Sequence, residues 1–157
     1  MRSVLLAAFA ILALAACSPA DDASPPPAQA EPAPMLGGID LGQPLRALGT
    51  EPFWGVDFTG TEMVYAGADR PEQRAPQPEP VVQGTTATWE AETSAGTPIS
   101  VMLAATECSD GMSDRTYPLS AIVRIGDETL TGCAATVAAI MSAGESGLVV
   151  EKAQPAG

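Results

Sequence analysis

The sequence predicts an all-β domain, a small antiparallel barrel or sandwich of six to seven strands with a possible short C-terminal helix. Apolar and polar residues alternate with a period of two in several runs of strand length. Turn residues separate these runs, and few stretches show the 3.6-residue period of a helix. Because the runs follow one another closely, we expect hairpin connections within one domain, over residues 43–151.

The start of the chain predicts export. Met1-Arg2 precedes an apolar run, Val4 to Ala16, which is shorter than the roughly 20 residues that span a bilayer. The run has the size of a signal-peptide core. The small residues before Cys17 resemble a bacterial lipobox. This resemblance implies removal of residues 1–16, a diacylglycerol thioether on Cys17 and a further acyl chain such as palmitate on its amino group. The alternative is an ordinary secretory signal that is cleaved elsewhere.

The residues after the predicted lipid site suggest the location and a tether. Ser18 follows Cys17, whereas an Asp would resemble an inner-membrane retention signal. We therefore expect a lipid anchor in the outer membrane, on its periplasmic face, held stably by more than one acyl chain. Residues 17–42 are predicted to be a tether, because the six prolines of residues 18–34 lie among small and polar residues. Residues 152–157 are predicted to be a disordered tail.

The charge of the chain limits its partners. The sequence has 7 basic and 19 acidic residues, a net charge of −12. Removal of residues 1–16, which include Arg2 and no acidic residue, would leave 6 basic and 19 acidic residues, a net charge of −13. Such a surface repels nucleic acid and anionic lipid headgroups and attracts a cationic protein or a cation. Solubility alone is the alternative explanation.

The composition disfavours catalysis. The chain has no His, which excludes imidazole as a general base or metal ligand, and its one Lys is Lys152, near the C-terminus. It has neither a Gly-x-Ser-x-Gly motif nor an obvious carboxylate dyad. Glu51, Glu90 and Glu92 are interpreted as solvated or loop residues. We therefore expect no enzymatic activity, no cofactor and no metal site. We also expect the protein to be a monomer.

The first predicted strands form a hairpin. Trp54, Val56 and Phe58 share one face of a strand, and Thr59-Gly60 is a plausible turn into residues 62–66. Residues 69–80 contain four prolines, three acidic residues and two arginines, so they are predicted to be a long exposed loop.

The later strands alternate in the same way. Runs at 85–92, 99–105, 119–125 and 128–133 each place apolar residues on one face. The expected inward residues are Ala87, Trp89, Ala91, Ile99, Val101, Leu103, Ala105, Leu119, Ala121, Val123, Ile125 and Leu130. Residues 134–142 fit either a short helix or a last strand, and residues 148–150 fit an edge strand.

Two cysteines remain once Cys17 carries lipid. Cys108 and Cys133 are expected to form a disulfide in an oxidising periplasm, closing a loop of about 25 residues worth roughly 3–4 kcal/mol. A redox or metal-binding pair is the alternative, which the wide spacing disfavours.

The polar loop after Cys108 is the predicted binding loop. Its candidate residues are Asp110, Met112, Ser113, Asp114 and Arg115. Carboxylates at Glu107, Asp110 and Asp114 could hold Ca²⁺, but a tight turn at Asp110-Gly111 is the more common meaning of this pattern. Asp114 could also pair with Arg115 or Arg124, as exposed pairs do at little gain in stability.

Three motifs carry a resemblance to a known family. They are Ala47-Leu48-Gly49-Thr50-Glu51-Pro52-Phe53-Trp54, Cys108-Ser109-Asp110-Gly111-Met112-Ser113-Asp114-Arg115-Thr116-Tyr117-Pro118 and Gly132-Cys133-Ala134. Together they resemble a family of uncharacterised Gram-negative envelope proteins, often lipoproteins, across residues 44–135. The resemblance implies a small periplasmic β-domain with paired cysteines and no assigned activity. Relatives of this domain more distantly resemble modules that accompany membrane-bound inhibitors of C-type lysozyme, but no inhibitor motif matches position by position.

Two functions of different classes follow. The first is an outer-membrane-tethered, non-catalytic binding module for a cationic envelope protein such as lysozyme. The second is a structural or assembly accessory of the outer membrane with no lysozyme-related role. Binding to lysozyme would favour the first, and defects in envelope integrity after deletion would favour the second.

Overall fold

The computed structural model describes residues 32–151. The predicted signal peptide (1–16), the lipidation site Cys17, the tether up to residue 31 and the predicted tail (152–157) lie outside the described residues. The described chain consists mostly of strands, which confirms the all-β class.

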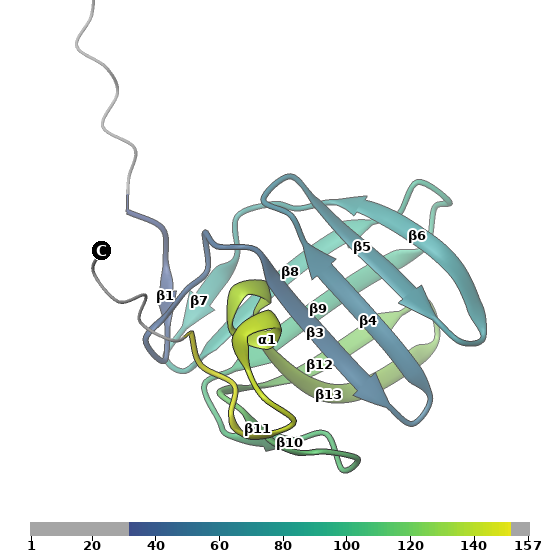
Figure 1. Ribbon diagram of the computed structural model, residues 1–157. Coiled ribbons are helices and arrows are strands. Elements are labelled where there is room, and N and C mark those ends of the chain that lie inside the picture. The colour runs from purple at the N-terminus through teal and green to yellow at the C-terminus, as the bar shows by residue number, and fades with distance from the viewer. Residues whose placement is uncertain (1–31, 152–157) are drawn as a thin grey trace, which may run out of the picture. The chain divides into compact units, whose positions relative to one another are not determined.

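Nine antiparallel strands form one sheet that curls into a half-barrel (Figure 1). This is more strands than predicted. Their order across the sheet is β6-β5-β4-β3-β13-β12-β9-β8-β7. The bounds are β3 (Leu45–Thr50), β4 (Phe53–Phe58), β5 (Glu62–Gly67), β6 (Arg70–Pro76), β7 (Val81–Gln83), β8 (Thr86–Glu92), β9 (Pro98–Ala104), β12 (Leu119–Ile125) and β13 (Glu128–Thr136).

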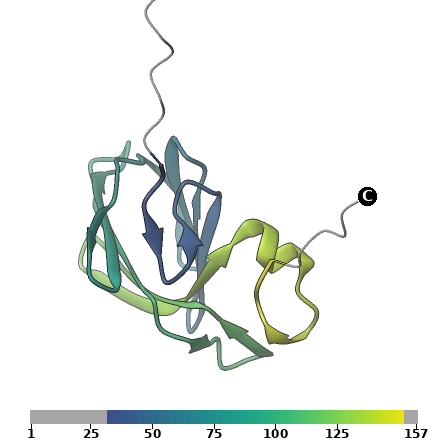
Figure 2. The same cartoon turned by 90° about the vertical axis from the view of Figure 1, so that its left-hand side faces the viewer.

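Smaller elements flank the half-barrel. A hairpin joins β1 (Met35–Leu36) and β2 (Ile39–Asp40), and a three-stranded sheet joins β10 (Cys108–Ser109), β11 (Asp114–Tyr117) and β14 (Ser146–Leu148). One short helix, α1 (Val137–Ser142), follows β13. Figure 2 shows α1 and the chain around β14 on one side of the curled sheet.

The inner face of the half-barrel holds the main core. Every predicted inward residue is buried or packs against this core, as alternation along a strand requires. Strands β3 and β5 also contribute Leu45, Met63 and Tyr65 to this core. The rings of Phe58 and Trp89, from β4 and β8, lie with their centroids 4.8 Å apart, so aromatic contact joins the two halves of the sheet.

A second, smaller core lies on the outer face. Tyr117, Cys133, Ala135, Ala139 and Val149 are buried together there. Because neighbouring residues of a strand point to opposite faces, β13 supplies Ala134 to the inner core and the residues on either side of it to the outer one.

Helix α1 closes this outer core. Its N-cap is Thr136, whose hydroxyl accepts a hydrogen bond from the amide of Ala139 at 3.1 Å. The ambiguity over residues 134–142 is thereby resolved, since β13 runs to Thr136 and the helix takes the following six residues.

The predicted loop at 69–80 is wrong for its first half. Residues 70–76 form β6, which lies at the edge of the sheet. An edge strand tolerates proline, because an amide on its outer side need not donate to a neighbouring strand. The sheet curls far enough that the amide of Ser94, just after β8, donates to the carbonyl of Arg74 at 2.8 Å.

The start and end of the folded part also differ from the prediction. Strand structure begins at Met35 rather than at residue 43, because Leu36 and Leu41 enter the core with 1% and 4% of their surface exposed. The last strand, β14, covers 146–148 rather than 148–150, and it pairs in parallel with β11. No helix in the described part of the chain is long and apolar enough to cross a bilayer.

Candidate functional site

The three sequence motifs meet around one cleft of about 530 Å³. Its walls are residues 49–51 at the end of β3, residues 108–112 in the predicted binding loop, and residues 131–132 in β13. These segments are far apart in the sequence but adjacent in the fold. We call this hollow the motif cleft.

A disulfide fixes one wall of the motif cleft. Cys108 in β10 and Cys133 in β13 are bonded, with their Cα atoms 5.5 Å apart, which confirms the predicted pair. Cys133 is fully buried in the outer core. The bond therefore attaches the loop to the central strand of the main sheet.

Asp110 organises the loop from within. Its Oδ1 accepts hydrogen bonds from the amides of Met112 and Ser113 at 3.0 and 2.8 Å, and its Oδ2 accepts from the hydroxyls of Ser113 and Tyr117 at 2.8 and 3.3 Å. Burial by itself would raise the pKa of Asp110. The hydrogen bonds to the ionised form outweigh it and hold the pKa below its ordinary value.

The same residue connects the loop to β3. The hydroxyl of Thr50 donates to the main-chain carbonyl of Asp110 at 2.9 Å. Gly111 follows with a φ of 73°, a conformation that glycine adopts without strain. This geometry matches the tight-turn interpretation of Asp110-Gly111. No group of three or more metal-ligating side chains in residues 32–151 is arranged to hold a metal ion.

The other predicted loop residues divide into two groups. Met112 lines the motif cleft with 67% of its surface exposed, and Ser113 supports the turn. Asp114 and Arg115 lie in β11 and do not line the cleft. The Nε of Arg115 donates to the carbonyl of Gly144 at 2.8 Å, and Asp114 forms no ion pair with any described residue, so neither alternative pairing of Asp114 occurs.

Sequence reasoning missed the contribution of the β3–β4 turn. Glu51 lines the cleft and is exposed. Phe53 pairs with Thr50 across the turn, so it lies beside the cleft, and 57% of its surface is exposed. The alternation of the strand could have revealed it. Successive side chains of a strand point to opposite faces, so Phe53, which directly precedes the inward-facing Trp54, points outward.

Two glycines without side chains form the floor of the cleft. Gly49 and Gly132 line it, and the indole of Trp54 lies directly behind them on the inner face. A Cβ on Gly49 would overlap the indole Nε1, and one on Gly132 would lie 2.9 Å from the indole Cζ2. Gly49 is therefore required by the ring that packs across it, and Gly132 by the same ring together with the carbonyl of Leu48, contacts among three strands that spacing in the sequence does not reveal.

Negative charge dominates around the cleft. Glu51 and Asp110 line it together with no Lys or Arg. Elsewhere in the described residues, Arg46, Arg70 and Arg74 each pair with a carboxylate. The motif cleft thus offers carboxylate oxygens and exposed apolar groups.

No family model, curated protein or solved structure matches the chain. The resemblance to envelope proteins stays a prediction from the three motifs.

Proposed function

We propose that the protein is a non-catalytic binding module, tethered through Cys17 to the periplasmic face of the outer membrane, whose motif cleft binds a cationic protein such as lysozyme. One observation carries this proposal: segments separated by up to about 80 residues in the sequence meet around a single open cleft. The disulfide and the Asp110 network hold its loop in place before any partner arrives. A preorganised loop loses little conformational entropy on binding.

The rim of the cleft has the composition of a protein-binding site. Phe53 and Met112 are exposed, and aromatic residues and Met are enriched where proteins bind one another. Glu51 supplies a carboxylate that no described Arg neutralises. A lysine or arginine of the partner, with its aliphatic stem against Met112 or Phe53, would satisfy both features.

The test is a titration of purified, oxidised protein with C-type lysozyme, following binding and lysozyme activity at low and physiological salt. We expect saturable binding that survives physiological salt, where the Debye length is about 8 Å. Met112→Ala should weaken binding about 5- to 30-fold, the range of a residue worth 1–2 kcal/mol. Glu51→Gln should weaken it less and reduce its dependence on salt.

Asp57→Asn is the control for a charge removed away from the cleft, and it also leaves Arg46 without its ion-pair partner. Asp57 lies on the outer face of β4, at the end away from the cleft, and its substitution removes the same charge as Glu51→Gln. Equal losses for Glu51→Gln and Asp57→Asn would mean general charge attraction and would contradict a site at the cleft. Flat titrations even at low salt would rule out lysozyme as the partner.

A further inference from the structure

We propose that the motif cleft is one end of a longer binding surface, which crosses the outer face of β13, β12, β9 and β8 and ends in a second recess at β7. Its occupant would be a folded basic protein that places a cationic group in each recess. This proposal rests on the proposed function and extends the contact area of the same site.

A continuous row of side chains connects the two recesses. Thr131 in β13, a wall residue of the motif cleft, pairs with Ile122 in β12, and Ile122 pairs with Met102 in β9. Met102 pairs with Thr88 in β8, and Thr88 pairs with Val81 in β7. Residues paired across strands point to the same face, so these five side chains form one uncharged row. Four strand spacings of about 4.8 Å make the row about 19 Å long when it is followed along the curled sheet.

The second recess lies at the edge of the sheet and has a volume of about 560 Å³. Val81, Thr88 and Met102 of the row contribute to its lining, with Glu79 and Glu90 beside them. Val81 is 61% exposed. Neither Glu79 nor Glu90 forms an ion pair with any described residue. Like the motif cleft, this recess combines exposed apolar atoms with carboxylates that lack a cation.

The distribution of charge along the surface favours a cationic partner. Both ends of the row are acidic and its middle is uncharged, so a partner with two separated cationic groups fits better than another acidic chain. Arg124, two residues after Ile122 in β12, flanks the row on the same face and would repel a partner that is basic throughout.

The size of the surface favours a folded protein over a single side chain. A specific interface covers about 800 Å² on each partner, more than one recess of this kind presents. The edge strand itself is a poor template for strand addition, because β7 has three residues and two prolines, Pro78 and Pro80, precede it. The partner is therefore expected to dock side chains on the face and not to extend the sheet.

The experiment compares the two ends of the surface with C-type lysozyme and, separately, poly-L-lysine as probes. Dissociation constants are measured at low salt for the wild type, Met112→Ala, the double variant Glu79→Gln/Glu90→Gln, Val81→Ser and the control Asp57→Asn. Chemical shifts of the amides of Thr88, Met102 and Ile122 are followed during each titration. All of these substitutions except Asp57→Asn change residues that line a recess, and none changes a fully buried residue.

We expect lysozyme binding to weaken at least threefold for the variants at each end and to change little for Asp57→Asn, with the row amides shifting as the complex forms. If Met112→Ala weakens binding while the β7 variants and the row amides do not respond, the extended surface is wrong and the cleft proposal stands. Loss confined to the β7 variants would overturn both, as would absence of binding to both probes.

Discussion

Asp110 is a carboxylate that the folded loop stabilises in its ionised form. Its pKa lies below the ordinary value of about 3.9 because the folded loop donates four hydrogen bonds to the carboxylate. A lowered folded pKa means that this stabilisation is complete above about pH 3.9 and is lost as the pH falls through the folded value.

The substitution Asp110→Asn tests this dependence. We expect a loss of about 1–2 kcal/mol in the free energy of unfolding at pH 7, because the neutral amide accepts weaker hydrogen bonds. The difference from the wild type should shrink as the pH falls below about 4, because the unfolded wild type binds a proton at Asp110 there and the folded protein does so only at lower pH. Urea unfolding of both proteins between pH 2.5 and 7 measures it, and a difference that grows towards acid would contradict the assignment.

At Gly132, stability depends on the absence of a side chain, because the neighbouring strand leaves no room for a Cβ. A Cβ there would overlap the carbonyl oxygen of Leu48 in the neighbouring strand. Gly55, also in a strand, offers its Cβ only ordinary contacts, the nearest at 3.5 Å from the guanidinium of Arg46. We expect Gly132→Ala to destabilise the protein by about 2 kcal/mol or more, and Gly55→Ala by less than about 1 kcal/mol. Equal losses in thermal unfolding would show that the Leu48 contact does not decide the cost.

At the scale of elements, we expect the disulfide to stabilise the three-stranded sheet more than the nine-stranded one. It links β10 to β13 across a sequence separation of 25, whereas the nine-stranded sheet has its own inner core. Replacing both cysteines by serine should cost about 3.5 kcal/mol by loop-closure entropy. Amide exchange should accelerate mainly in β10, β11 and the cleft loop, while β9 and β12 stay protected. Uniform acceleration in hydrogen-exchange experiments would mean that the two cores unfold together.

The sequence predicts those strands in which apolar and polar residues alternate within the strand itself. Trp54, Val56 and Phe58, or the run from Ile99 to Leu103, show the period of a half-buried strand without reference to any other part of the chain. The edge strand β6 was missed because its prolines look like loop residues until the sheet order places the strand at an edge, where a backbone amide need not donate to a neighbouring strand.

The candidate site was predictable only in part, for a related reason. Asp110 and Met112 follow from a polar turn next to a cysteine, which is a local pattern. Glu51 and Phe53 join them only because β3 lies beside β13, and the contact of Trp54 with Gly49 and Gly132 depends on the same neighbours. Sequence separation hides contacts that pass across three strands.

For the whole molecule, the excess of negative charge is the dominant long-range interaction. With a net charge of −12 and few basic residues, repulsion among carboxylates acts against the folded state. Raising the salt from 10 to 150 mM shortens the Debye length from about 30 to about 8 Å, so we expect Tm to rise by a few degrees. Circular dichroism at pH 7 measures this. A fall in Tm would mean that the surface ion pairs of Arg46, Arg70 and Arg74 outweigh the repulsion.

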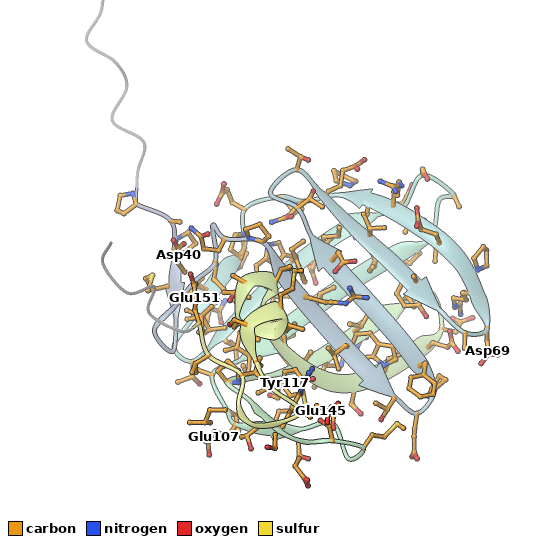
Figure 3. The ribbon with its side chains drawn as sticks, viewed as in Figure 1. Asp40, Asp69, Glu107, Tyr117, Glu145 and Glu151 are labelled. Atoms are coloured by element: carbon orange, nitrogen blue, oxygen red, sulfur yellow. A yellow bond between two sulfur atoms is a disulfide. The ribbon has the colours of Figure 1, made fainter. Side chains whose placement is uncertain are left out.

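The two ends of β3 have different neighbours. The chain reaches β3 through the β1–β2 hairpin, where Asp40 lies (Figure 3), and the motif cleft begins at the other end of the strand. Five residue steps of about 3.3 Å separate the two ends by about 17 Å. The cleft therefore lies at the end of β3 that is farther from the point where the chain enters the described domain.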